Sequence, residues 1–509
     1  MLTKGHWLAR GAATLALTLG LPAAGLAQGD IGWTLDPTPL QATTGLTHHS
    51  GVVLASLTDG GDSGVASDDA ALSARLEALE AKHDDLESAY ESLEKSLKGY
   101  AQTGHSSSTM KISGRIHADL WGFPGDSPGV DGFESDDPNL SPQDRIEFRR
   151  VRFGVAGDLP SNMVYKIEME FAGGDDSQFR DVYLGWDELP VFQMLLLGNQ
   201  KRPYGLDHIN SSRYNVFIER PFVIEGFNQD SRRFGLQSYG FSEDLAWNWR
   251  YGVFNQRLIQ DEGKYVSDHW QGQIAGRLAN TIWYDEASDG RGYAHWAVSG
   301  TWADTDQNAN DENFADSGID EARFRTRPEA RTDSRWLDTG VIAGSQDYSL
   351  LGLEAVMNVG PCQLVAEHQQ VWLNRLDNRQ VNFHGSYAYL SYFFTGEHMP
   401  WDRETGALDR ITPFENFFLV DTCRGGCGHG MGAWQIAARW SYADFADQDI
   451  QGGVGESFTL GLNWYWTAYS RMQFNYLYGE IDQNDLNAAA GAPNFGNYQV
   501  LGARFMVDF

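Results

Sequence analysis

The chain of 509 residues lacks any long apolar run beyond its first 27 residues. No later window holds 18 consecutive apolar residues, whereas a helix needs about 20 of them to cross a bilayer. The mean hydropathy is −0.42, yet 13% of the residues are aromatic and 17 of them are Trp. A chain that crosses a membrane with β-strands reconciles these values, because apolar residues then alternate with polar ones and aromatic residues gather at the interfaces.

Basic residues and cysteines are both scarce. The 38 Lys and Arg residues face 69 Asp and Glu residues, which gives a net charge of −31 at pH 7. This balance excludes a typical nucleic-acid-binding protein, which needs a basic surface. The three cysteines are too few for a disulfide framework. We expect Cys423 and Cys427 to form a small loop disulfide and Cys362 to stay a thiol, because a metal site at Cys423, Cys427 and His429 would lack a fourth ligand.

The N-terminus has the three-part pattern of a secretory signal peptide. Lys4 and Arg10 are followed by small and apolar residues as far as Leu21, and small residues at Gly25 and Ala27 suit cleavage after Ala27. We therefore expect residues 1–27 to direct export of the chain.

The next two segments are a linker and a helix. Residues 28–66 are rich in Gly, Thr, Ser and Asp and show no periodicity, which predicts a flexible linker. Residues 67–99 carry a heptad pattern, which predicts a short coiled-coil helix. Its d positions are Leu72, Leu79, Leu86 and Leu93, and its a positions are Leu76, His83, Tyr90 and Leu97. The number of helices in the coil cannot be read from these residues.

From Lys111 the apolar residues recur at every second position. Ile112, Ile116 and Leu120 alternate with polar residues, and the pattern continues to Leu501, Phe505 and the terminal Phe509. Residues 108–509 are therefore predicted to form an all-β domain, a transmembrane antiparallel β-barrel with apolar side chains facing lipid and polar ones facing a wet lumen. The runs number 16 or 17, and because single-chain bacterial barrels have even strand numbers we expect 16 strands, with 18 as the alternative. Sixteen strands leave an aqueous channel.

Arginines recur at the same period in two places. Arg323, Arg325 and Arg327 would share one face of a strand, and Arg150 and Arg152 would lie opposite Val151 and Phe153. Arginines facing lipid would cost about 2–4 kcal/mol each, so we expect them to face the lumen. There they could conduct an oxyanion through their planar donor forks, or they could neutralise an acidic lining that includes Glu168 and Glu170.

Several segments together resemble the phosphate-selective porins O and P of Gram-negative outer membranes. The resemblance runs across the whole predicted barrel. Its most specific pieces are Gly198–Gly205 with Glu219 and Arg220, Phe394–Glu397 with Trp401, Gly406, Arg410 and Pro413, Gly432–Gln435 with Ala438–Ser441, Leu460–Tyr465, and Leu501–Phe509.

This resemblance implies a function and a set of partners. The family has an arginine ladder, which residues 323–327 resemble, and a constriction loop, from which Lys201, Arg213 and Arg220 would extend into the pore. It implies a homotrimer in the outer membrane, surrounded by lipid and lipopolysaccharide, that passes small anions such as phosphate. We expect no cofactor and no enzymatic activity, since no nucleophile-elbow Ser and no pair of metal-binding His residues occurs. A general-diffusion or sugar porin on the same scaffold remains the alternative.

Overall fold

The structure is a computed structural model that describes residues 108–126, 128–134, 141–172, 177–228, 231–256, 270–305, 322–342, 344–377, 379–421, 426–484 and 495–509. The predicted signal peptide, linker and coiled coil (residues 1–27, 28–66 and 67–99) lie outside these ranges and stay predictions. Cys423 also lies outside them, so the predicted disulfide is untested. Cys362 is a half-buried free thiol.

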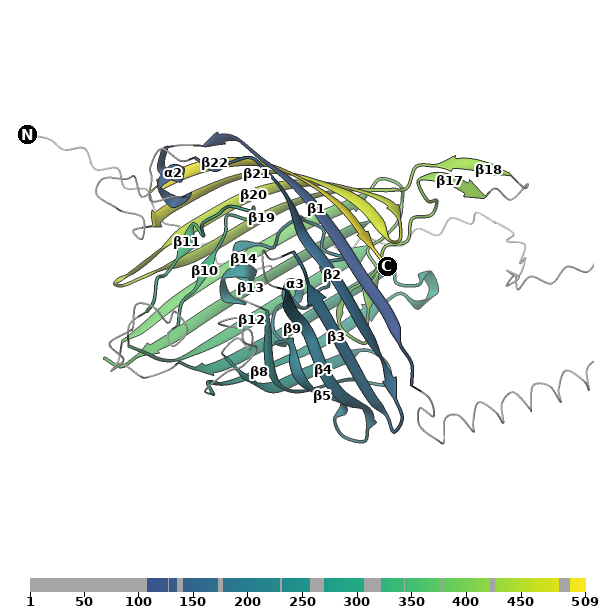
Figure 1. Cartoon of the computed structure of the whole chain (residues 1–509), viewed down its shortest axis with the longest axis horizontal. Coiled ribbons are helices and arrows are strands. Elements are labelled where there is room, and N and C mark those ends of the chain that lie inside the picture. Colours follow the sequence, from purple (N-terminus) through teal and green to yellow (C-terminus); the bar gives the residue numbers. More distant parts are fainter. Residues whose placement is uncertain are drawn as a thin grey trace, which may run out of the picture. The chain divides into compact units, whose positions relative to one another are not determined.

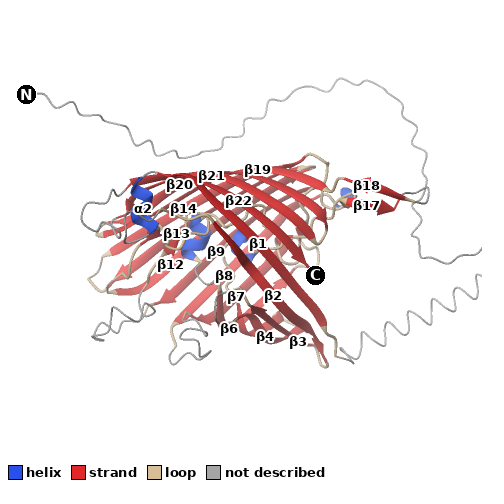
Figure 2. Cartoon of the chain, turned by 45° about the horizontal axis from the view of Figure 1, so that its top comes forward, coloured by secondary structure: helices blue, strands red, loops and turns tan. Residues whose placement is uncertain are grey.

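Sixteen strands of the described chain form one closed antiparallel barrel (Figures 1 and 2). Strands pair in sequence order, and β1 closes the barrel by pairing with β22, where Arg115 lies opposite Asp508. This confirms the predicted fold class and strand number. The barrel strands are β1 (Lys111–Asp126), β2 (Arg145–Leu159), β3 (Met163–Glu170), β4 (Gln178–Leu189), β5 (Gln193–Lys201), β6 (Arg232–Phe241), β7 (Trp247–Asn255), β8 (Gly272–Tyr284), β9 (Gly292–Asp304), β12 (Ser345–Val359), β13 (Cys362–Arg375), β14 (Gln380–Phe393), β19 (Ala433–Asp447), β20 (Ile450–Thr467), β21 (Ser470–Asn484) and β22 (Phe495–Asp508).

The outer wall is apolar and the inner wall is polar. On β1 the side chains of Ile116 and Leu120 are exposed, whereas those of His117 and Asp119 are buried inside the barrel. The terminal Phe509 is exposed as well. This is the polarity that a membrane-spanning barrel needs, because its outer face meets lipid and its inner face meets water and polar loops. Within the described ranges, no helix is both long and apolar enough to cross a membrane.

The two ends of the barrel differ in the length of their connections. At one end, called here the short-turn end, strands are joined by brief turns such as residues 160–162, 360–361 and 468–469. The other end, the loop end, carries long connections that include residues 202–231 and 305–344. One long connection, residues 394–432, belongs to the short-turn end.

These three long connections contain most of the remaining elements. The β5–β6 loop (residues 202–231) contains helices α3 (Leu206–Ile209) and α4 (Phe222–Phe227). The β9–β12 loop (residues 305–344) contains the paired strands β10 (Arg325–Thr326) and β11 (Leu337–Asp338). The β14–β19 connection (residues 394–432) contains β15 (Trp401–Asp402), β16 (Ala407–Leu408), β17 (Phe418–Asp421) and β18 (Cys427–Gly430). Elsewhere lie α2 (Pro128–Glu134) and a 3₁₀ turn at Glu286–Ser288.

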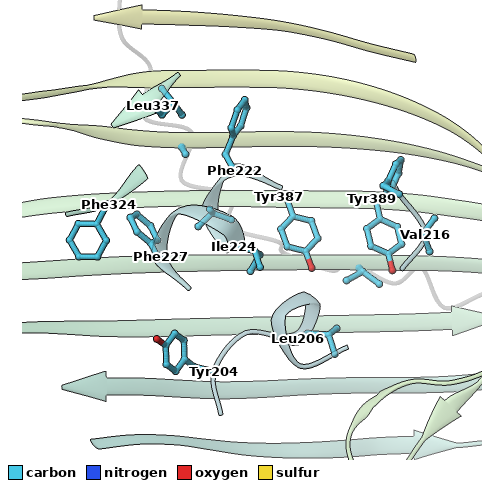
Figure 3. Packing of buried hydrophobic residues seen from close by; sticks show 14 of the residues in the cluster. Tyr204, Leu206, Val216, Phe222, Ile224, Phe227, Phe324, Leu337, Tyr387 and Tyr389 are labelled. Atoms are coloured by element: carbon cyan, nitrogen blue, oxygen red, sulfur yellow. The ribbon is translucent and has the colours of Figure 1, made fainter. Parts of the chain in front are cut away.

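A hydrophobic cluster inside the barrel fixes the loops to the wall (Figure 3). The ring of Phe324 lies 5.6 Å from that of Phe227 in α4, and 5.5 and 5.7 Å from the rings of Tyr348 and Phe383 on the wall. Figure 3 shows Ile224 of α4 close to Tyr387 of β14. The expectation of a simple open lumen was therefore incomplete, because the loops carry apolar residues that pack inside the barrel and leave a smaller space for solutes.

Gly205, at the start of α3, illustrates how closely the loop approaches the wall. Its φ of 80° lies in the left-handed region, and a Cβ atom there would lie 2.8 Å from the side-chain nitrogen of Gln369 on β13. Glycine is the residue that tolerates both conditions. The carboxylate of Glu367, also on β13, accepts hydrogen bonds from the backbone N–H groups of Leu206 and Asp207, at 2.7 and 2.8 Å. This part of the loop is thus fixed to the wall through its backbone.

Candidate anion pathway

A strongly basic cavity of about 580 Å³ lies between the β5–β6 loop, the β9–β12 loop and the inner wall around β1–β6. Twelve arginines and two lysines line it, against four carboxylates. In a chain with a net charge of −31, this concentration of basic residues sets the cavity apart from the acidic composition of the whole. The basic residues are Arg115, Arg149, Arg150, Arg152, Lys166, Arg180, Lys201, Arg213, Arg220, Arg232, Arg325, Arg327, Arg331 and Arg335, and the carboxylates are Glu168, Asp181, Glu219 and Glu225.

Strand β2 supplies three of the arginines because it contains a β-bulge. His117 and Ala118 of β1 pair with Arg150 and Phe148, so Arg149 is an extra residue without a partner in the register. A bulge interrupts the alternation of side chains. Arg149 and Arg150 therefore both line the cavity together with Arg152, while Phe148 and Phe153 face outward. The predicted inward orientation of Arg150 and Arg152 agrees with this geometry.

A second bulge brings a basic and an acidic residue of β4 to the cavity. Ile167 and Met169 of β3 pair with Val182 and Phe179, which leaves Arg180 and Asp181 opposite the one intervening residue. Both line the cavity. Asp181 accepts hydrogen bonds from Arg232 at 2.6 Å and from Lys166 at 2.7 Å, so this one carboxylate balances one of the two positive charges.

Two glutamates on β3 neutralise further basic residues of the wall. Glu168 lies 3.1 Å from Arg152 and 3.3 Å from Arg115, and Glu170 lies 2.6 Å from Arg152. Part of the arginine set thus balances buried carboxylates, as the alternative interpretation of the sequence expected. The balance is incomplete, because the arginines of the cavity outnumber its carboxylates three to one.

The β5–β6 loop and its flanking residues hold the three basic residues assigned to a constriction loop. Arg213 and Arg220 do belong to this loop, but Lys201 is the last residue of β5, so its assignment to the loop was wrong. Lys201 Nζ donates to the carbonyl oxygens of Ile209 and Asn210 at 2.9 and 2.8 Å, which fixes the end of α3. Arg220 donates to the carbonyl oxygen of Asp207 at 3.0 Å. All three residues line the cavity.

The arginine row at residues 323–327 belongs to the β9–β12 loop and not to a barrel strand. Its alternation holds, since Ala322, Phe324 and Thr326 are buried. Arg325 and Arg327 line the cavity. Arg323 does not, because it binds Asp338 with its Nε and a terminal nitrogen at 2.8 and 2.5 Å. Of the three predicted arginines, two therefore line the cavity. The third, Arg323, binds Asp338 within the same loop.

Glu219 connects the loop to the basic wall. It accepts two hydrogen bonds from Arg149, at 2.8 and 3.1 Å, and one from Arg504 of β22, at 2.9 Å. Burial alone would raise the pKa of Glu219, but the charges of Arg149, Arg504 and Arg150 hold it well below its ordinary value. The carboxylate is therefore ionised at neutral pH.

The basic residues of the β9–β12 loop lie close enough to repel one another. Burial, followed by the charge of Arg331, lowers the pKa of Arg327 to about 10. At neutral pH Arg327 stays protonated all the same. His208 of α3 also lines the cavity, but burial and the charge of Lys201 lower its pKa well below the ordinary value, so it is neutral there.

Three wall arginines keep a donor that no protein atom uses. Within the described chain, the buried Nε–H groups of Arg115, Arg150 and Arg180 have no hydrogen-bond acceptor. Arg150 is 4% exposed, and one of its terminal nitrogens lies 3.3 Å from Nδ1 of His117. Buried donors without an acceptor are costly, so these groups suit an anion or water that enters the cavity.

Sequence reasoning found seven of the lining basic residues and missed the others. Arg149 and Arg180 lie at bulges, where simple alternation fails. The sequence does carry a signal for the bulge at Arg149. Phe148 and Val151 are both apolar but three positions apart, which breaks the period of two. Lys166 alternates correctly on β3 but carries no feature that singles it out. Arg232 has the same parity on β6 as the exposed Phe234 and Leu236, so alternation would place it on the outer wall. Arg331 and Arg335 follow the row in an irregular loop, where no periodicity applies.

Known proteins with similar barrels provide a comparison. The chain is 25% identical over 369 residues to an uncharacterized protein of Caulobacter vibrioides. The aligned region covers 71% of this chain and 68% of the relative. An anion-selective porin from Comamonas acidovorans superimposes with a TM-score of 0.46 at 13% identity, over 79% of this chain and 100% of that one. The outer membrane channel DcaP of Acinetobacter baumannii gives a TM-score of 0.45 at 11% identity, over 80% and 99%.

The family itself is settled by a match that spans the barrel. The family model described as phosphate-selective porin O and P matches residues 110–509, which include every barrel strand. The predicted resemblance is thereby confirmed. The chain belongs to the phosphate-selective porin O and P family, and it is an outer-membrane porin.

Proposed function

We propose that this porin conducts small anions, and phosphate-class oxyanions in particular, through the basic cavity. The observation that carries the proposal is the cavity lining, in which fourteen basic residues face four carboxylates although the whole chain has a net charge of −31. A ring of one charge sign sets the selectivity of a pore. Arginine suits this role because its guanidinium stays charged and presents a planar fork of donors that matches two oxygens of an oxyanion.

The arrangement also supports passage and not permanent binding. Arg115, Arg150 and Arg180, whose Nε–H groups have no acceptor among the described residues, lie on β1, β2 and β4 of the wall, and Arg325 and Arg327 line the same space from the β9–β12 loop. An anion can therefore exchange one set of donors for the next without regaining all its water. Binding that is shared between neighbouring sites admits an ion and still releases it.

The experiment is a reversal-potential measurement on purified porin in a planar bilayer with a KCl gradient. We expect the potential of an anion-selective channel, and we expect added phosphate to reduce the chloride current at concentrations far below those of chloride. A reversal potential near zero, without phosphate block, would instead identify a general-diffusion or sugar porin.

We also propose a homotrimer, which the family and the heptad in residues 67–99 support. The exposed aromatic and aliphatic residues of the outer wall would then contact outer-membrane lipid, with lipopolysaccharide at the loop end. Mass measurement in mild detergent tests the assembly, and a species of monomer mass alone would contradict it. Truncation of residues 68–98 separates the contribution of the coil from that of the barrels.

A further inference from the structure

A second, much smaller pocket with basic walls lies near the short-turn end of the barrel, beside the turn at residues 468–469. Arg213, Arg410 and Arg471 line it, with Tyr214, Tyr465 and Ser470. We call it the exit pocket. Arg213 and Tyr214 line both the large cavity and the exit pocket, so the two spaces are neighbours.

A buried carboxylate on the closing strand holds two of these arginines. The side chain of Asp508 is 1% exposed, and its Oδ2 lies 3.0 Å from Nε of Arg213. The same carboxylate accepts hydrogen bonds from Arg410. Arg213 comes from the β5–β6 loop and Arg410 from the β14–β19 connection, so Asp508 joins two in-folded segments to β22.

The third arginine of the exit pocket has a different set of partners. Arg471 donates to Tyr465 Oη at 3.1 Å and to the carbonyl oxygen of Asn215 at 2.8 Å. Its buried Nε–H has no acceptor among the described residues. The pocket therefore offers an unused donor as well as two guanidinium groups that a carboxylate now occupies.

The size of the pocket limits what can enter it. Its volume is about 10 Å³, about enough for one water molecule. A tetrahedral oxyanion cannot occupy this space while Arg213 and Arg410 stay bound to Asp508. It can do so when it replaces the carboxylate, because both anions offer oxygen pairs that fit a guanidinium fork.

We propose that Asp508 is an internal counter-anion of the transport path, which a travelling oxyanion displaces from Arg213 and Arg410 and which then takes them back. This inference rests on the proposed anion conduction. Asp508 acts through the arginines and is a positioning residue. By competing for the same donors, it keeps the exit pocket from holding the anion tightly and so promotes release at the short-turn end.

The experiment compares phosphate block of the chloride current in the full-length porin and its variants, with phosphate added to one side of the bilayer at a time. In Asp508→Asn the competing charge is gone while the shape of the side chain is kept. We expect the half-blocking phosphate concentration to fall by about tenfold, the factor that one charge-assisted contact gives. We expect this decrease only when phosphate is added to one side of the membrane, because the exit pocket lies at one end of the barrel.

Two matched variants separate this role from a structural one. Asp508→Glu retains the charge and should keep a half-blocking concentration close to that of the wild type. Asp119→Asn removes another buried carboxylate of the inner wall, one that binds Arg504 and lines neither space, and should not reproduce the one-sided change. An equal shift in Asp119→Asn, or wild-type block in Asp508→Asn, would overturn the proposal.

Folding is checked by the heat-dependent migration of the barrel in detergent gels. If Asp508→Asn does not fold, the double variant Asp508→Asn with Arg410→Gln removes both members of one pair. Its half-blocking concentration should be close to the wild-type value and lower than that of Arg410→Gln alone; the reverse order would contradict the proposal. A wild-type channel without anion preference would refute the proposed function itself, whereas an anion-selective wild type with an unaltered Asp508→Asn refutes this inference alone.

Discussion

Arg149 binds Glu219 through two hydrogen bonds of 2.8 and 3.1 Å, and this pair joins the bulge of β2 to the β5–β6 loop. The carboxylate thus has two effects. It holds the loop inside the barrel, and it cancels part of the positive charge at the cavity.

Replacement of Glu219 by Gln should separate these effects. The amide cannot balance Arg149 and Arg504, so we expect a more anion-selective reversal potential and stronger phosphate block. The loss of charge-assisted hydrogen bonds should lower stability by about 1–3 kcal/mol, measured by thermal unfolding in detergent. Glu225→Gln is the control. This substitution also removes one negative charge, but Glu225 lies 4.0 Å from Arg327 and forms no bidentate pair with it. Equal stability losses in both variants would contradict the assigned role of Glu219.

The pKa of Glu219 predicts how the loop responds to acid. Because the pKa in the folded protein lies well below the ordinary value, the carboxylate contributes stability that is fully present above about pH 5 and is lost as the pH falls through the folded pKa. We expect single-channel conductance to stay steady between neutral pH and about pH 5 and current noise to increase in stronger acid. Glu219→Gln should lack that acid-dependent increase. Noise that begins near neutral pH would point to a different group.

The arginine row provides a comparison within one segment. Arg325 and Arg327 line the cavity, whereas Arg323 is bound to Asp338. The double variant Arg325→Ala with Arg327→Ala should weaken phosphate block by about tenfold or more, as expected for loss of charge-assisted contacts. Arg323→Ala should leave the reversal potential unchanged and lower thermal stability instead. If Arg323→Ala changed selectivity as much as the double variant, the assignment of the cavity lining would be wrong.

The sequence allowed the barrel to be predicted because its main determinant is local. Ile116 and Leu120 face lipid and His117 and Asp119 face inward as alternation requires, and this pattern repeats along strand after strand. The inward position of Arg150 and Arg152 follows from the same rule. Arg149 could not be assigned by it, because one extra residue in β2 changes which side chains point inward.

The contents of the barrel depend on contacts between residues far apart in the sequence, and these were not predictable. Phe324 contacts Phe227, Tyr348 and Phe383, and none of these residues carries a sequence signal for the others. The role of Asp338 as the partner of Arg323 depends in the same way on how β10 pairs with β11. A row of arginines therefore indicated the proposed anion pathway, but the fold of the loop decides which of these arginines line the cavity.

The packing of Phe324 leads to a last prediction about the width of the path. Phe324 is 5% exposed and fixes the β9–β12 loop, with Arg325 and Arg327, against the inner wall. Phe324→Ala should cost about 3–5 kcal/mol of packing energy, and because the strands themselves remain paired we expect that cost to appear as release of the loop and not as loss of the barrel. Single-channel conductance should then rise while anion preference and phosphate block fall, since the two arginines leave the cavity. Phe324→Leu keeps most of the apolar volume and should stay close to the wild type. A Phe324→Ala channel with wild-type conductance and block would show that the hydrogen bonds of the loop alone hold the arginines in place.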